Sequence, residues 1–358
     1  GEMKTKPTQH SVMRLREIGL EPDVLVCRTE QNHHLSQKLK KKLALFCNVD
    51  REHVFESPDV DTIYEIPLVL HDQGFDRTII KRLNIKNKRK HSMIKDLNSS
   101  IETFKSPRHT VNIAMCGKYN SLHDAYKSIL EAFIHAGISN DAKVNIKWVD
   151  TEKLESDSKD INKFFKGVDG ILIPGGFGDR GIEGKILSAH YARENQIPFF
   201  GICLGMQCAV IEFSRNICQM KQANSTEFNK KTPYPVIDLM PSQKKVKGKG
   251  ASMRLGKYPC YIVKRTNTFR AYNTFSIFER HRHRYELNNK YRGSLENKGL
   301  IISGINKKLN LVEIMELKGH PWFIGVQFHP ELKSRVMKAH PLFNSFIKSA
   351  IKYSDVSK

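Results

Sequence analysis

The chain has 358 residues, of which 39% are hydrophobic and 27% charged, so it can build a packed core and is not wholly disordered. Its length predicts two domains, since a domain usually takes roughly 100–200 residues. The formal net charge is +22, which suggests nucleic acid or small anionic ligands as partners. The sequence contains no apolar run long enough to span a membrane and no signal peptide near its first residues. The seven cysteines form no CxxC pair and no metal-binding spacing with histidine, which favours a reducing, cytoplasmic compartment without a metal site.

The first 90 residues have the pattern of a small domain. Pro22–Arg28 predicts a short buried strand, and Ile79–Leu83 predicts the end of a helix. Leu43–Cys47 fits a strand and a helix equally well. The basic run Lys86–His91 and the polar residues after it predict a linker at 91–108, with nuclear localisation or nucleic-acid contact as the alternative for the run.

Strands and helices alternate in residues 109–353. The predicted strands are Val111–Gly117, Val144–Val149, Gly170–Gly176 and Pro198–Cys203, and the predicted helices are Asp124–Ala136, Ile182–Glu194 and Met206–Arg215. This alternation predicts parallel βαβ units in an α/β sheet. Active sites on such sheets lie at the carboxyl ends of the strands.

A glycine-flanked cysteine stands where the last of these strands turns into a helix. Gly201–Gly205 has the G-x-nucleophile-x-G form of a nucleophile elbow, with Cys203 in place of serine. Small residues flank such a turn because larger side chains would clash. The helix N-terminus favours the thiolate of Cys203 and offers the N–H of Leu204 to a developing oxyanion. The alternative is a structural cysteine in a tight turn.

A cysteine nucleophile needs a base, and the base needs a group that orients it. His329 and Glu331 supply both about 125 residues later, after a predicted strand at Trp322–Gln327. Residues i and i+2 of an extended segment point the same way, so His329 is expected to face Cys203 while Glu331 supports its other ring nitrogen. The glycine-rich loop Pro174–Gly178 follows another predicted strand and offers backbone N–H groups of the kind that form an oxyanion hole.

Together these residues resemble the class I glutamine amidotransferases, and longer motifs narrow the resemblance to the CTP synthase family. The motifs cover nearly all of the chain: Gly1–Val12, Asp59–Tyr64, Gly175–Gly184, Asn224–Phe228, Met253–Gly256 and Glu279–Glu286. The resemblance implies a class I glutamine amidotransferase domain of α/β fold at 109–353, with a mostly parallel sheet and the cysteine elbow. It implies that residues 1–90 are the remainder of an α/β synthetase (amidoligase) domain.

The resemblance also implies an activity. CTP synthases are glutamine-hydrolysing ligases that make CTP from UTP, ATP and glutamine, and ammonia passes through an internal tunnel to the synthetase domain. Cys203 would form a γ-glutamyl thioester, His329 would be the acid and base, and Glu331 would orient His329. The family's P-loop and magnesium carboxylates precede the segment where this chain begins. The chain alone is therefore expected to hydrolyse glutamine and not to make CTP.

The motif positions further imply binding residues. Glutamine and its oxyanion would be held by Gly176, Leu204, Gly205, Met206, Gln207, Glu227, Arg284 and Tyr285. A carboxylate suits the α-amino group, and a guanidinium suits the α-carboxylate. UTP or CTP would contact Lys4, Thr5, Lys6, Pro7, Thr8, Gln9, Lys42 and Phe46, and ATP would contact Arg28, Asp59 and Val60. Two alternatives stay open. Phe46 could be a core aromatic and not a nucleotide contact, and the residues of Arg280–Arg284 other than Arg284 could form a solvated basic segment.

No cofactor is expected in this chain. ATP and Mg²⁺ are expected in the full-length enzyme, with GTP as an allosteric activator near the lid motif Met253–Gly256. Gly250–Ser252 departs from the family's Gly-Gly-Thr, which leaves the GTP response open. The resemblance further implies a cytoplasmic homotetramer without nucleic-acid or membrane partners. The alternatives are a catalytically silent assembly fragment, a nucleic-acid-binding protein, and the glutaminase of another class I amidotransferase, against which the Lys4–Gln9 motif argues.

Overall fold

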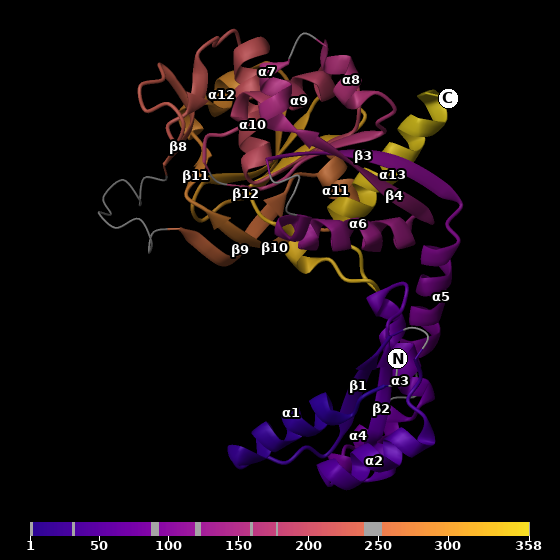
Figure 1. The fold of residues 1–358 in the computed structure, drawn as a ribbon. Helices are drawn as coiled ribbons and strands as arrows, with labels where there is room; N and C mark the ends of the chain where they lie inside the picture. Colours follow the sequence, from indigo (N-terminus) through magenta and orange to yellow (C-terminus); the bar gives the residue numbers. More distant parts are fainter. Residues whose placement is uncertain are drawn as a thin grey trace. The chain divides into compact units, whose positions relative to one another are not determined.

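The computed structural model describes residues 3–30, 33–86, 93–118, 123–157, 160–176, 178–239 and 253–357. The chain forms two compact units, Gly1–Glu102 and Thr103–Lys358, whose elements are drawn in Figure 1. Helix α5 (Met93–Lys105) occupies most of the predicted linker, and the division between the units falls within it. Most of the basic run, at 87–91, and the departure at 250–252 lie outside the described residues.

The first unit contains a two-stranded parallel sheet and short helices. Its elements are α1 (Lys6–Glu17), β1 (Leu25–Thr29), α2 (Gln37–Cys47), η1 (Arg51–His53), β2 (Val54–Pro58), η2 (Ile63–Glu65), α3 (Ile66–Asp72) and α4 (Phe75–Arg82). The ambiguous segment Leu43–Cys47 is helical. Ser36 caps α2 by accepting the N–H of Leu39, and Leu43 and Cys47 lie one turn apart on its buried side. The core of this unit is small: Val12, Leu25, Leu35, Leu43, Cys47 and Val54.

A nine-stranded sheet forms the centre of the second unit. Its strands are β3 (His109–Gly117), β4 (Ala142–Asp150), β5 (Gly170–Ile173), β6 (Phe199–Ile202), β9 (Arg254–Ile262), β10 (Ser276–His283), β12 (Leu300–Asn306), β13 (Leu311–Leu317) and β14 (Phe323–Val326). They lie in the order β10-β9-β12-β13-β14-β6-β5-β3-β4. The run from β14 to β4 is parallel, as the alternating pattern predicted. The remaining strands extend the sheet by antiparallel pairing, which was not predicted.

Helices cover both faces of this sheet (Figure 1). One face packs against α6 (Lys127–Ser139), α11 (Asn267–Tyr272) and α13 (Pro341–Ser357), and the other against α7 (Thr151–Ser156), α8 (Ile161–Phe165), α9 (Ile182–Glu194), α10 (Leu204–Asn216) and α12 (Asn289–Asn297). Strand β3 presents apolar side chains to both faces. Ile113 and Met115 belong to a first hydrophobic cluster, on the face covered by α6 and α13, and Ala114 and Cys116 belong to a second cluster, on the face covered by α9 and α10. A strand buried on both faces has this continuous apolar sequence.

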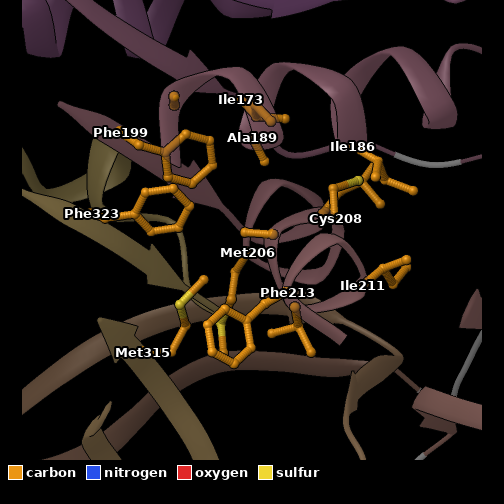
Figure 2. Close-up of a cluster of buried hydrophobic side chains, with 14 of the residues drawn as sticks. Ile173, Ile186, Ala189, Phe199, Met206, Cys208, Ile211, Phe213, Met315 and Phe323 are labelled. Carbon is orange, nitrogen blue, oxygen red and sulfur yellow. The ribbon is translucent and has the colours of Figure 1, made fainter. Parts of the chain in front are cut away.

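The second cluster surrounds helix α10 (Figure 2). The rings of Phe199 and Phe323, which pair across β6 and β14, stack with centroids 4.2 Å apart. Met206 of α10 packs beside them and is 1% exposed. The helix that follows the cysteine is therefore a central element of the core. A three-stranded sheet of β7 (Ala223–Ser225), β8 (Tyr234–Leu239) and β11 (Tyr285–Leu287) lies beyond it in the chain.

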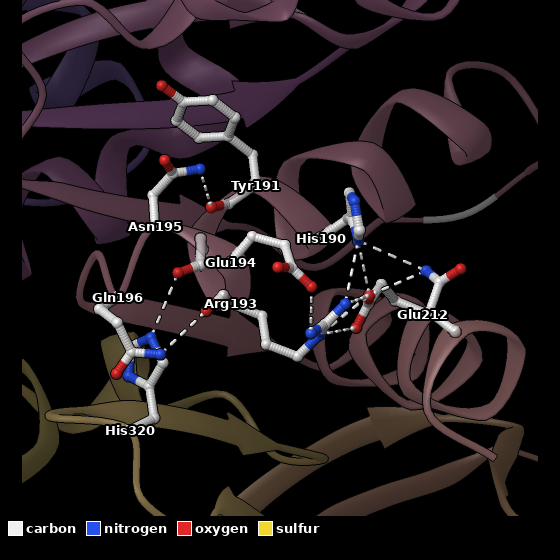
Figure 3. A network of polar contacts seen from close by, with 10 residues as sticks. His190, Tyr191, Arg193, Glu194, Asn195, Gln196, Glu212 and His320 are labelled. Carbon is white, nitrogen blue, oxygen red and sulfur yellow. Dashed lines mark hydrogen bonds and ion pairs between the residues drawn. The ribbon is translucent and has the colours of Figure 1, made fainter.

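A buried ion pair ties α9 to α10 (Figure 3). Arg193 of α9 contacts Glu212 of α10 through Nε at 3.1 Å and through a terminal guanidinium nitrogen at 2.8 Å. His190 Nδ1 lies 3.0 Å from the same carboxylate, whose side chain is 0% exposed. Burial alone would raise the pKa of Glu212, but His190 and Arg193 hold it below its ordinary value. The two helices are thus fixed by charge as well as by apolar contacts.

All seven cysteines are free thiols. Five are buried, namely Cys47 in the first unit and Cys116, Cys203, Cys208 and Cys260 in the second, whereas Cys27 and Cys218 are partly exposed. Burial raises the pKa of Cys116 and of Cys208 to about 12, which leaves these thiols protonated and inert. Within the part of the chain that the structure describes, no helix is both long enough and apolar enough to cross a membrane.

Candidate active site

Cys203 lies at the sharp turn between β6 and α10. Its backbone has φ 51° and ψ −100°, a conformation that L-residues rarely adopt. The N–H of Cys203 donates to the Val326 carbonyl at 2.6 Å, which ties the turn to β14. A Cβ on Gly201 would lie 2.7 Å from the Gly205 carbonyl carbon, and one on Gly205 would lie 2.2 Å from the Ile173 oxygen. The glycines are thus required by backbone contacts, as the elbow motif predicted.

His329 and Glu331 form a hydrogen-bonded pair just beyond β14. Nδ1 of His329 lies 2.8 Å from Oε1 of Glu331. An ionised carboxylate only accepts hydrogen bonds, so Nδ1 carries the proton and donates it. The expectation of an extended segment was wrong, because Glu331 lies in the 3₁₀ helix η5 (Pro330–Lys333). This short helix turns the chain so that the carboxylate reaches back to the ring.

The glycine-rich loop closes on this pair. A Cβ on Gly175 would lie 2.8 Å from Cε1 of His329 and 3.5 Å from Cβ of Cys203. The absence of a side chain at Gly175 therefore lets the loop, the nucleophile and the base meet. Nε2 of His329 is buried and has no hydrogen-bond partner among the described residues, although Cys203 is close enough to act on its charge.

The environment of His329 favours its protonated form. Burial disfavours the charged ring, but Cys203 and Glu331 outweigh burial and raise the pKa of His329 well above its ordinary value. Two other histidines nearby behave in the opposite way. Burial lowers the pKa of His281 and, to about 3, that of His283, so both stay neutral. His329 is therefore the one of these three histidines that can hold a positive charge beside the thiol.

Seven of the residues predicted for the triad and for glutamine line one cavity. Its walls are Gly176, Cys203, Leu204, Gln207, Glu227, Met253, His283, Arg284 and Tyr285. The other four do not line it: Gly205 packs against Ile173, the Met206 side chain points into the core, and His329 and Glu331 lie behind Cys203 and Gly175. Met253 and His283 were not predicted. His283 lies on the buried side of β10 with residues 277, 279 and 281, a side on which three of the four residues are polar and which therefore gives no hydrophobic signal in the sequence.

Two residues of opposite charge, Glu227 and Arg284, line the cavity. Glu227 and Arg284 interact across it, and the N–H of Gly178 donates to the Glu227 carboxylate. Burial raises the pKa of Glu227, while Gly178 and Arg284 act against that rise. A ligand with one ammonium and one carboxylate group matches this pair.

Gln327 is a site residue that sequence reasoning missed. Its Nε2 lies 3.7 Å from Sγ of Cys203, and its Oε1 accepts from Nε2 of Gln207 at 3.3 Å. Gln207 also donates to the Tyr285 carbonyl at 2.9 Å. These amides form a chain that joins the nucleophile to the strand carrying Tyr285. The available signal was its position two residues before His329.

The predicted ATP residues gather at the carboxyl ends of β1 and β2 in the first unit. Arg28 lies 3.5 Å from Asp59 between charged atoms, and the N–H of Asp59 donates to Thr29 at 2.9 Å. Val60 follows directly in the chain. Carboxyl ends of parallel strands are the usual ligand-binding edge of such sheets.

The predicted UTP and CTP residues lie on two helices of the same unit. Lys4–Gln9 surround the start of α1, where Thr5 is buried and accepts from Nε2 of Gln9 at 3.1 Å. Lys42 and Phe46 lie one turn apart on α2. Phe46 is 56% exposed, so the alternative of a core aromatic was wrong. No three potential metal ligands of the His, Cys, Asp or Glu type gather among the described residues.

Comparisons with known proteins agree with this geometry. Residues 121–349 match the family model of class-I glutamine amidotransferases, and residues 1–85 match that of the CTP synthase N-terminus. A CTP synthase of Caldanaerobacter subterraneus subsp. tengcongensis is 54% identical over 351 residues, covering 98% of this chain and 64% of the relative. One of Chloroherpeton thalassium is 55% identical over 355 residues, covering 99% of this chain and 63% of the relative. The chain thus spans less than two thirds of the length of these relatives.

A solved structure is similar to the second unit. The Trypanosoma brucei CTPS glutaminase domain with bound acivicin has 41% sequence identity to this chain and a TM-score of 0.64. The match covers 68% of this chain and 94% of the trypanosomal domain.

Proposed function

The chain belongs to the class-I glutamine amidotransferase family, and we propose that Cys203, His329 and Glu331 hydrolyse glutamine in the cavity at the β6–α10 elbow. The observation that carries this proposal is that Cys203 and the His329–Glu331 pair both lie against Gly175, so that the nucleophile and the base are neighbours. A nucleophile, a base and an orienting carboxylate in this arrangement fit acyl transfer.

The first half of the reaction makes a thioester. Sγ of Cys203 attacks the side-chain amide carbon of glutamine, and the negative charge moves to the amide oxygen. The N–H groups of Gly176 and Leu204 donate hydrogen bonds to that oxygen, and the N–H of Leu204 is available because the first N–H groups of a helix have no intrahelical partner. His329 then gives its proton to the departing nitrogen, and ammonia leaves behind a γ-glutamyl thioester.

The second half restores the enzyme. His329, now neutral, takes a proton from a water molecule that attacks the thioester carbon, and the carbon–sulfur bond breaks. Glutamate leaves and the Cys203 thiolate faces the protonated ring again. Glu331 keeps Nδ1 protonated throughout, so that Nε2 is the nitrogen that gives and takes the proton.

Glutamine is recognised through its amino-acid end. We assign the α-amino group to Glu227 and the α-carboxylate to Arg284, which face the same cavity as Cys203. The acivicin-bound trypanosomal domain supports this assignment, since its sequence is 41% identical to this chain. Acivicin is accordingly proposed to occupy the same cavity here.

The released ammonia serves the amination of UTP to CTP in the proposed whole enzyme. The match of residues 1–85 to the CTP synthase N-terminus supports this. Lys4–Gln9, Lys42 and Phe46 are proposed to contact UTP or CTP, and Arg28, Asp59 and Val60 to contact ATP. ATP with Mg²⁺ as substrate, GTP as activator, internal transfer of ammonia, homotetramer assembly and a cytoplasmic location belong to the same proposal.

The test is a glutaminase assay of this chain beside Cys203→Ala, with and without GTP. Cys203→Ala is expected to abolish ammonia release and covalent labelling by acivicin, whereas Cys218→Ala is expected to retain both. Glutamine hydrolysis that persists in Cys203→Ala would overturn the proposal. Labelling at Cys203 without turnover would indicate an intact but unactivated site.

A further inference from the structure

The short helix η5, which carries Glu331, is attached to strand β10. Lys333 of η5 donates from Nζ to Oε1 of Glu279 at 3.1 Å. At the start of the same segment, the N–H of His329 donates to the Arg280 carbonyl at 2.8 Å. Nζ of Lys333 also donates to the Phe278 carbonyl of β10 at 2.5 Å, so residues 329–333 are fixed to β10 by a backbone hydrogen bond at one end and by both contacts of Lys333 at the other.

Glu279 is the centre of a buried polar cluster. Its side chain is 0% exposed, and its Oε1 accepts from Lys333, from the Tyr272 hydroxyl at 3.1 Å and from Nε2 of His340 at 3.3 Å. The N–H of Leu342 donates to Nδ1 of His340, so Nε2 is the ring nitrogen that donates to the Glu279 carboxylate. Burial alone would raise the pKa of Glu279, but His340 and Lys333 hold it below its ordinary value.

The chain after η5 is held on its other side. Oγ of Ser334 accepts the N–H of His340 at 3.2 Å and lies 2.9 Å from Nδ1 of His135 in α6. Both histidines and the serine are buried. The η5 segment is thus held between β10 and α6.

We propose that Glu279 is a positioning residue for the triad, which anchors Lys333 and thereby holds η5 so that Glu331 reaches Nδ1 of His329. This inference rests on the proposed glutaminase reaction. A buried carboxylate is a poor source of stability, because its desolvation offsets much of what its ion pair contributes. Oε2 of Glu279 has no hydrogen-bond partner among the described residues, so the cluster is not optimised for stability alone.

The consequence for catalysis is geometric. The hydrogen bond between His329 and Glu331 spans only two residues, so a small rotation of η5 lengthens it. Misplacement of a catalytic group by about 1 Å can cost up to ~100-fold in rate. Glutamine binding depends on Glu227 and Arg284, neither of which lies in η5, so a displacement of η5 should lower kcat and leave KM nearly unchanged.

The test uses Glu279→Gln, which keeps the shape of the side chain and removes its charge. We expect kcat for glutamine to fall roughly tenfold, with KM changed by less than about twofold. The pKa of His329, followed by imidazole NMR and assigned with His329→Gln, should fall toward its ordinary value. The other titratable groups packed here are Cys203, Glu331, His281 and His283 around His329, and Tyr272, Lys333, His340 and Cys260 around Glu279. None of these is changed in Glu279→Gln.

Variants at Lys333 show whether the effect passes through η5. Lys333→Met should reproduce Glu279→Gln, and Lys333→Arg should retain most of the activity because it can keep the ion pair. The double variant should be no worse than either single variant, since both break one link. A double variant that lowers kcat by the product of the two single effects would contradict a shared path.

A control separates positioning from general weakening. Arg193→Met breaks a buried ion pair elsewhere and should lower the melting temperature without moving the His329 titration. Glu279→Gln that lowers only the melting temperature, with kcat and the His329 pKa as in the parent chain, would overturn the inference. The titration needs no turnover, so it tests the anchor even if Cys203→Ala shows that the proposed reaction itself is wrong.

Discussion

At the scale of single residues, Glu331 determines how far the charged state of His329 extends into the alkaline range. Glu331→Gln removes one of the two groups that raise the pKa of His329. The alkaline limb of kcat/KM should therefore move to lower pH, as a pH–rate profile would reveal. The charged ring stabilises the native state fully below its ordinary pKa of about 6.5, and this contribution is lost as pH rises through the raised native value. If the alkaline limb does not move in Glu331→Gln, Glu331 does not contribute to the raised pKa of His329.

Gly205 tests the steric basis of the elbow. Gly205→Ala places a Cβ 2.2 Å from the Ile173 oxygen, a backbone atom that cannot move aside. We expect the free energy of unfolding to fall by about 1–3 kcal/mol and glutaminase activity to be lost. Gly293→Ala is the matched control, since nothing lies within 4 Å of its new Cβ in the interior of α12. It should raise stability by about 0.4–1 kcal/mol in the same denaturant titration.

At the scale of elements, the pair of helices α9 and α10 depends on Arg193. Arg193→Met leaves the Glu212 carboxylate buried without its guanidinium partner (Figure 3). The free energy of unfolding should fall by about 3–5 kcal/mol, measured by denaturant titration. Arg292→Met removes a partly exposed pair with Glu296 on α12 and should cost only about 0.5 kcal/mol. Equal losses in both variants would mean that leaving the Glu212 carboxylate without Arg193 costs no more than breaking a surface pair.

Strand β10 shows where sequence reasoning at this scale stops. The alternative of a solvated basic segment at Arg280–Arg284 holds for Arg280 and Arg282, which are exposed. His281 and His283 between them are buried, with Nδ1 of His281 3.1 Å from Nε2 of His283. The residues that make this burial tolerable, such as Glu313, come from distant strands. A charged strand whose partners are far away in sequence gives no local hydrophobic signal.

The parallel half of the sheet was predictable for the opposite reason. Its central strands are apolar and alternate with helices along the chain, and helix α9 has the predicted bounds Ile182–Glu194. The elbow followed from its own glycines. The approach of Gly175 to His329, the turn of η5 and the amide of Gln327 depend on how separate segments meet. No pattern within one segment encodes those contacts.

At the scale of the whole molecule, the two units differ in the size of their cores. The first unit buries six residues in its hydrophobic cluster and leaves Leu45 78% and Phe46 56% exposed. The second unit contains two hydrophobic clusters of buried residues, each much larger than the cluster of the first unit. Backbone amides of β1 and β2 should therefore exchange with deuterium faster than those of β5 and β6, as measured by exchange with mass spectrometry. Equal protection in both units would contradict this difference.

The buried free thiols can be used to measure how often the core of each unit opens. Cys47 lies in the core of the first unit, and Cys116 and Cys208 lie in the core of the second. A small thiol-trapping reagent can reach each of them only while its surroundings are open, and each modified peptide has a distinct mass. The modification rates of these native cysteines therefore measure separately how often the core of each unit opens, without any introduced label. Cys203 lines the active-site cavity, so we expect a reagent that enters the cavity to modify it without opening of the core.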